Sequence, residues 1–168
     1  MADSWRSAYF KQARADYDLF LILEKTENIP LCHRLHYLQM MTEKLAKGFR
    51  TPKGGIEYAH THEAFVPFLR IVKSRPEFIF LRGAMTKNQF DAYIVGLYPL
   101  AERIQRLAPD LATGPNPEYP WATQQSIVAP IEFSFPDINL NAKDVRLNKL
   151  LTLIGICFEI AKRELESA

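Results

Sequence analysis

The sequence is poor in cysteine and has no long hydrophobic run. Its two cysteines, Cys32 and Cys157, are isolated among 168 residues, which excludes a disulfide framework and predicts two reduced, packed thiols. The richest apolar stretch, 150–158 (LLTLIGICF), is well short of the roughly 20 residues that cross a bilayer. The opening MADSWRSAYF has no hydrophobic signal core. We therefore expect a cytoplasmic protein that does not enter a membrane.

Most sequence signatures of catalysis and of cofactor binding are missing as well. The chain has no HExxH or paired-cysteine pattern for zinc, no nucleophilic triad and no GxGxxG fingerprint. Gly54 and Gly55 are adjacent, but the Lys-Ser/Thr pair that defines a phosphate-binding loop does not follow them. The sequence therefore predicts neither a cofactor nor a metal site.

The overall composition is that of one globular domain covering residues 1–168. A hydrophobic fraction of 48% with 24% charged residues is enough for a sizeable core. The net charge of +2 says little, but its distribution is uneven, since residues 34–87 contain ten Lys and Arg against four Glu. Clustered positive charge favours an anionic partner, although solvated helix faces give the same pattern.

The segment from Pro30 to Arg50 predicts a central helix. Proline fits the first turn of a helix, and apolar residues then recur at spacings of three and four: Leu31, Leu35, Leu38, Leu45 and Phe49. Tyr37, Met40 and Met41 interrupt the opposite side, which indicates neighbours on more than one face and leaves a narrow polar strip of His36, Glu43 and Lys47.

Similar periodicity predicts further helices around this one. They are expected over 3–27, 63–74, from Thr86 through Leu107 with a kink or break at Pro99, and over 144–164. Residues 109–141 contain six prolines and predict an extended excursion, with at most a short strand in IVAPIEFSF. The predicted fold class is all-α: an up-and-down bundle of about five helices with a long Pro-rich excursion before the last helix.

The order and spacing of several stretches resemble the HEPN domain, a family of small helical bundles. They are WRSAYFKQARADYDLFLIL, then CHRLHYLQMMTEKLAKGF with its Gln followed by Glu-Lys and a second Lys, then HTHEAFVPFL, and NPEYPW before the last helix. The resemblance implies an all-α bundle that dimerises and binds RNA or a nucleotide.

Many HEPN proteins are metal-independent ribonucleases with an Arg followed four to six residues later by His. That motif is absent, because the nearest arginine upstream of His60 and His62 is Arg50, and Arg34 precedes His36 by only two positions. Glu118 also stands where an arginine often precedes the Tyr-Pro pair. The chain therefore resembles the branch without this nuclease motif, for which binding together with a partner protein is the expected role.

The candidate binding surface lies where the central helix runs into its glycine loop. Cations for phosphates and rings for stacking on bases follow one another there: Lys44, Lys47, Arg50, Lys53, Tyr58, His60 and His62. The same lysines also suit a helix C-terminus, and Glu43 to Lys47 is a favourable i, i+4 pair.

Three alternatives remain open on the sequence. If the protein is a ribonuclease of toxin or defence type, His60 or His62 with Arg50 would supply a base and a cation. The four histidines, with His33 and His36 one helical turn apart, offer a weak zinc set. The aromatic and aliphatic segment 127–135 would dock a partner protein if the chain is an interaction module.

Overall fold

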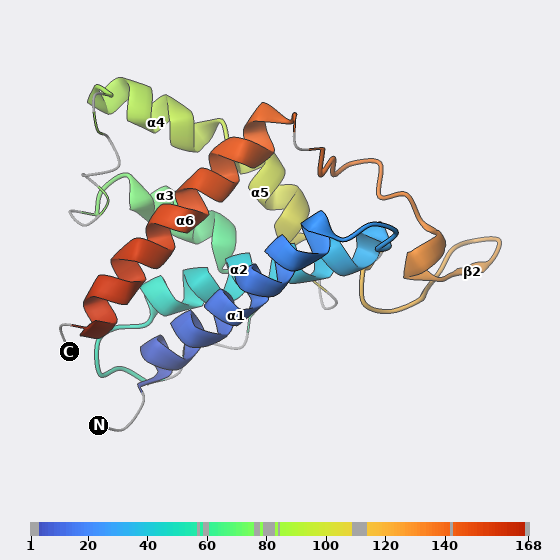
Figure 1. The fold of residues 1–168 in the computed structure, drawn as a ribbon, viewed down its shortest axis with the longest axis horizontal. Helices are drawn as coiled ribbons and strands as arrows, with labels where there is room; N and C mark the ends of the chain where they lie inside the picture. The colour runs from blue at the N-terminus through green and yellow to red at the C-terminus, as the bar shows by residue number, and fades with distance from the viewer. Residues whose placement is uncertain are drawn as a thin grey trace.

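The computed structural model describes residues 4–56, 58, 61–75, 78, 83, 85–108, 114–141 and 143–166. Its helices are α1 (Trp5–Lys25), α2 (Leu31–Arg50), α3 (Phe65–Val72), α4 (Lys87–Val95), α5 (Tyr98–Gln105) and α6 (Val145–Glu166). Before α6 lie two short strands, β1 (Trp121–Ala122) and β2 (Ile127–Val128), and the 3-10 helix η3 (Pro130–Glu132). The chain is an all-α helical bundle, which confirms the predicted fold class (Figure 1).

Helices α1 and α2 form an antiparallel hairpin. The Ser4 side chain caps α1 by accepting a hydrogen bond from the Ser7 backbone N–H at 3.2 Å. Ion pairs join the middle of α1 to the second half of α2, as in Asp16–Lys44, and the end of α1 to the start of α2, as in Glu24–Arg34. The short link between the two helices therefore turns the chain back on itself.

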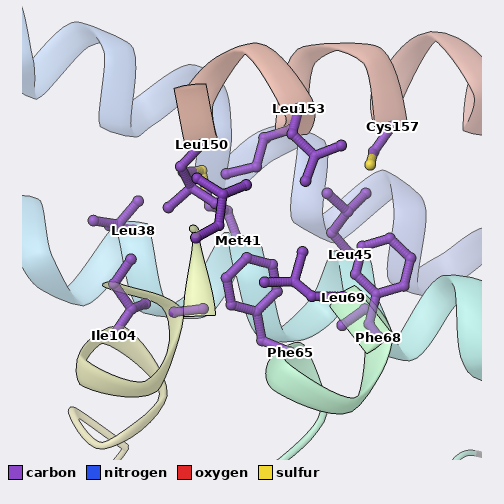
Figure 2. Close-up of a cluster of buried hydrophobic side chains, with 14 of the residues drawn as sticks. Leu38, Met41, Leu45, Phe65, Phe68, Leu69, Ile104, Leu150, Leu153 and Cys157 are labelled. Carbon is purple, nitrogen blue, oxygen red and sulfur yellow. The ribbon is translucent and has the colours of Figure 1, made fainter. Parts of the chain in front are cut away.

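Helix α2 is the centre of the bundle, as its sequence predicts. Twelve of its twenty residues are buried, including polar ones, so neighbours cover it on several faces. Figure 2 shows side chains from four helices meeting in one interior: Leu38, Met41 and Leu45 of α2, Phe65, Phe68 and Leu69 of α3, Ile104 of α5, and Leu150, Leu153 and Cys157 of α6. Cys32 and Cys157 are both buried free thiols, as expected.

The helical run around Pro99 is broken into α4 and α5. Thr86 and Gln89 form a capping box at the start of α4, each side chain bonding the backbone N–H of the other residue. Helix α4 ends at Val95, and Pro99 sits in the first turn of α5, where its missing N–H costs no hydrogen bond. The predicted helix start at Thr86 and the predicted break at Pro99 are both confirmed.

The described part of the excursion, 114–141, crosses the end of the molecule away from both termini (Figure 1). Trp121 pairs with Val128 in an antiparallel hairpin of two strands. Trp121, Phe133 and Phe135 form their own aromatic cluster, with ring centroids 5.1–6.3 Å apart. The predicted short strand is present as β2, and Pro130 ends it by starting η3.

None of the helices in the described ranges has both the length and the apolar character needed to span a membrane. Helix α6 has an exposed side, with Thr152 and Glu159 for example, and these residues are buried: Leu147, Leu150, Leu153, Ile154, Cys157, Phe158 and Ala161.

Candidate nucleic-acid interface at the end of α2

The end of α2 is held in place by buried backbone and side-chain hydrogen bonds. The Thr51 backbone N–H and hydroxyl both donate to the Lys47 carbonyl at 2.8 Å. The buried Arg6 guanidinium donates to the Thr51 carbonyl at 2.8 Å and, through Nε, to Glu164 of α6 at 3.0 Å. The point where the helix gives way to the loop is therefore fixed against both α1 and α6.

A tight turn follows the helix and carries Lys53 into solvent. The Gly55 N–H donates to the Pro52 carbonyl at 3.0 Å, and Gly54 has φ +70°, a backbone conformation that glycine adopts without strain. Lys53 is exposed, and it makes no hydrogen bond or ion pair with the part of the chain that the structure describes. Its ammonium group is thus available to an anion.

Lys44, by contrast, is directed into the α1–α2 hairpin. Its Nζ lies 2.7 Å from Oδ2 of Asp16, and the two side chains are 19% and 8% exposed. Gln12 donates a second hydrogen bond to the same carboxylate at 3.1 Å. The charge of Lys44 is neutralised inside the fold, so this residue joins two helices.

Glu43 and Lys47 of the polar strip of α2 are buried, and they belong to a compact network. We call Gln39, Glu43, Lys47 and His62 the Glu43 cluster. Oε1 of Glu43 accepts from Lys47 Nζ at 2.7 Å, and Oε2 lies 2.7 Å from both Gln39 Nε2 and His62 Nδ1. Glu43 is 5% exposed and Lys47 8%. The cluster attaches the end of the glycine loop to α2, since His62 comes from just before α3.

The Glu43 carboxylate stays ionised within this cluster. Burial is the largest single influence and acts to raise the pKa of Glu43. Hydrogen bonds from Lys47, His62 and Gln39, with the charge of Lys47, outweigh burial and hold that pKa below its ordinary value. The cluster is therefore a buried ion pair with additional donors.

Arg50 and Tyr58 form the aromatic part of the interface. The Arg50 guanidinium lies over the Tyr58 ring, 4.7 Å from its centroid. Both residues are half-buried, and the exposed Lys53 lies between them in sequence. We call Arg50, Lys53 and Tyr58 the cationic rim. It is what the structure leaves for an anionic ligand once Lys44 and Lys47 are paired internally.

The histidines of the sequence do not come together where they are described. His36 lies near the start of α2, 3.8 Å from the Glu118 carboxylate of the excursion, whereas His62 contacts Glu43 seven residues further along. His36 and Glu43 are therefore about 10 Å apart along the helix axis. His33 is exposed, and His60 lies outside the described residues. Within the described ranges no three His, Cys, Asp or Glu side chains gather as metal ligands.

The predicted docking segment, 127–135, is partly covered by its own aromatic cluster. Phe135 is buried and Phe133 half-buried. Ile127 and Ile131, however, are 78% and 63% exposed. This segment therefore presents two aliphatic side chains to solvent.

Sequence reasoning identified one of the partners that decide which lysines are available and missed the others. The i, i+4 spacing of Glu43 and Lys47 was a usable signal for their pairing. The pairs Asp16–Lys44 and Glu43–His62 join residues 28 and 19 positions apart, and no local pattern identifies them.

Comparison with known proteins identified no relative of this chain. The chain matches no protein-family model, and neither a curated protein nor a solved structure proved similar to it.

Proposed function

We propose that the protein binds RNA or a nucleotide at the cationic rim without cleaving it, and acts in the cytoplasm together with a partner protein. The observation that carries the proposal is the Arg50 guanidinium over the Tyr58 ring at 4.7 Å; between them in sequence is the exposed Lys53, which makes no ion pair within the described residues. Single-stranded RNA is recognised by this combination of cations for phosphates and flat groups on which bases stack.

The resemblance to the HEPN domain gives the proposal independent support, because RNA or nucleotide binding is what it implies. It also leads us to expect a homodimer. Light scattering on the purified protein tests that expectation directly.

A metal-independent ribonuclease is the second candidate function. The contact that favours it is His62 Nδ1 on the buried Glu43 carboxylate, since a carboxylate behind an imidazole fixes the tautomer and the ring orientation of a general base. Arg50, at the end of the same helix, would supply positive charge for the phosphorane. Binding requires only the cationic rim, whereas cleavage requires this further arrangement, so we place binding first.

The test is a gel-retention and cleavage assay with labelled single-stranded RNA in the presence of a chelator. We expect retention at about 50 mM salt that weakens strongly at about 200 mM, since phosphate contacts release counterions. Lys53→Glu should weaken binding by about tenfold and lower the salt slope by about one. Arg50→Lys keeps the charge but loses the flat guanidinium, so it should also weaken binding.

Lys143→Glu is the matched control, because Lys143 is an exposed loop lysine before α6. Retention that is equally insensitive to Lys53→Glu and to Lys143→Glu would exclude the cationic rim. Discrete RNA fragments that disappear in His62→Ala or His60→Ala would establish the ribonuclease instead. If RNA is neither retained nor cleaved, the exposed Ile127 and Ile131 remain as the basis for a protein-docking role.

A further inference from the structure

A second candidate site lies between α5 and the excursion, away from the cationic rim. It is a cavity of about 380 Å³, and six of the residues that line it carry the argument: Arg103, Arg106, Gly114, Phe133, Phe135 and Asp137. Ligand pockets in proteins have volumes of about 300–1,000 Å³. The cavity is thus large enough for a small organic molecule.

Its aromatic wall is rigid and strained. Phe135 is 3% exposed and has φ +45°, a conformation that bulky residues rarely adopt. The rings of Phe133 and Phe135 meet edge to face, with centroids 5.1 Å apart, and Trp121 packs against both. Strained backbone persists only where surrounding contacts enforce it, and it is concentrated at ligand sites. This wall offers a planar ring a fixed surface.

The lining also carries two arginines, Arg103 and Arg106. Arg103 Nη1 donates to the Asp137 backbone carbonyl at 2.7 Å, which anchors that side chain beside the cavity. The Arg106 side chain makes no hydrogen bond or ion pair with any residue in the described ranges. Asp137 also lines the cavity, so its described lining contains two arginines and one aspartate. The described lining residues therefore carry an excess positive charge.

We propose that this cavity binds a small organic anion in which a planar ring carries a carboxylate or a phosphate. The ring would lie against Phe133, and Arg106 would bind the anionic group through its guanidinium fork, which fits both oxyanions. Arg103, held by the Asp137 carbonyl, adds a second cation. Gly114 in the lining has no side chain to obstruct a ligand, and an added Cβ there would meet nothing within 4 Å.

This site is independent of the proposed RNA site. The excursion contacts the start of α2 through the His36–Glu118 pair, whereas the cationic rim lies at the other end of the helix. A helix of twenty residues spans about 30 Å. A variant that loses binding at one of the two sites can therefore still be assayed for binding at the other.

Binding can be followed through Trp121, which contacts both phenylalanines, in a Trp5→Phe background that removes the other tryptophan. The probes are benzoate and adenosine 5′-monophosphate, their neutral analogues benzyl alcohol and adenosine, and inorganic phosphate. We expect at least one of the two ring anions to bind about tenfold or more tightly than its neutral analogue and than inorganic phosphate, because the neutral analogue lacks the charge-assisted hydrogen bond and inorganic phosphate lacks the ring. Which anion binds identifies the carboxylate or the phosphate class.

Arg106→Gln should abolish the preference for the anion, while Arg70→Gln, at an exposed arginine of α3, should leave it unchanged. Phe133→Leu should weaken the anion and its neutral analogue equally. The proposal is overturned if neither ring anion binds, or if Arg106→Gln binds as the parent protein does. RNA retention by Arg106→Gln, measured on the same sample, shows whether the cationic rim still functions.

Discussion

At the scale of single residues, ion pairs at and near the Glu43 cluster determine which cations in the middle of the chain remain available to a ligand. The sequence places Lys44 and Lys47 among the candidate binding cations beside Arg50, although it also pairs Lys47 with Glu43. In the folded protein Asp16 and Glu43 bind them, and only the end of the basic segment remains open to a ligand. The local charge excess is thus smaller at the surface than the sequence indicates.

Glu43→Gln should be strongly destabilising. The substitution leaves the buried Lys47 without its counter-ion, and breaking a buried ion pair from one side typically costs a few kcal/mol. We expect a loss of about 2–3 kcal/mol in the free energy of unfolding, measured by urea denaturation. Glu132→Gln, at an exposed position of η3, is the control and should change stability by less than about 0.5 kcal/mol.

Comparing the parent protein with Glu43→Gln also predicts how the stability contributed by Glu43 changes with pH. The pKa of Glu43 is lowered in the folded state, so its stabilising contribution is complete above the unfolded value of about 4.3 and is lost as the pH falls through the folded pKa. The difference in stability between the parent and Glu43→Gln should therefore shrink below about pH 4.3. A difference that stays constant into acid would show that the carboxylate charge is not what stabilises the cluster.

At the scale of helices, the α1–α2 hairpin depends on a close approach at Gly48. A Cβ built on Gly48 would lie 2.4 Å from Cε1 of Phe10, which is too close for any real contact. Phe10 cannot move freely, because it also packs against Phe49 with centroids 4.8 Å apart. Glycine is therefore required inside this helix despite its poor helix propensity.

Gly48→Ala should destabilise the protein although alanine is the better helix former. We expect a net loss of about 1–3 kcal/mol from overpacking. Gly155 of α6 is the matched control, since nothing lies within 4 Å of its added Cβ, and Gly155→Ala should stabilise by about 0.5–1 kcal/mol. Thermal unfolding of both variants checks the prediction, and stabilisation by Gly48→Ala would contradict the close packing.

The helices themselves were predictable because their signals are local. The Pro30 start of α2, the Thr86–Gln89 capping box and the break at Pro99 each act within one or two turns of helix. A periodic apolar stripe then identifies the buried side, as with Phe65 and Phe68 of α3. Fold class and approximate bounds follow from such signals.

The candidate sites were only partly predictable, because their partners are distant in sequence. Nothing near Lys44 in the sequence indicates that Asp16 will bind it, and nothing near Arg106 indicates that it will line a cavity together with Phe133 and Phe135. These pairings depend on how whole elements dock. The Arg50–Tyr58 contact spans only eight residues, and the predicted surface contained both of them.

At the scale of the whole molecule, Arg6 joins the two ends of the chain to the end of α2. Its buried guanidinium binds Glu164 of α6 and also donates to the carbonyls of Phe49 and Thr51. These carbonyls belong to the last turn of α2 and to its cap, just before the glycine loop. The position of the cationic rim therefore depends on contacts made by the first and last helices.

A double-mutant cycle on Arg6 and Glu164 should reveal this coupling. We expect Arg6→Gln and Glu164→Gln to be non-additive by about 1–3 kcal/mol, because the two side chains are in direct contact and largely covered. The exposed i, i+4 pair Arg14–Asp18 serves as the reference and should couple by about 0.3–0.5 kcal/mol. Free energies of unfolding from urea denaturation, measured for the parent and for the single and double variants of each pair, supply the values for both cycles. Coupling at Arg6–Glu164 no larger than at Arg14–Asp18 would show that α6 is held by its apolar face alone.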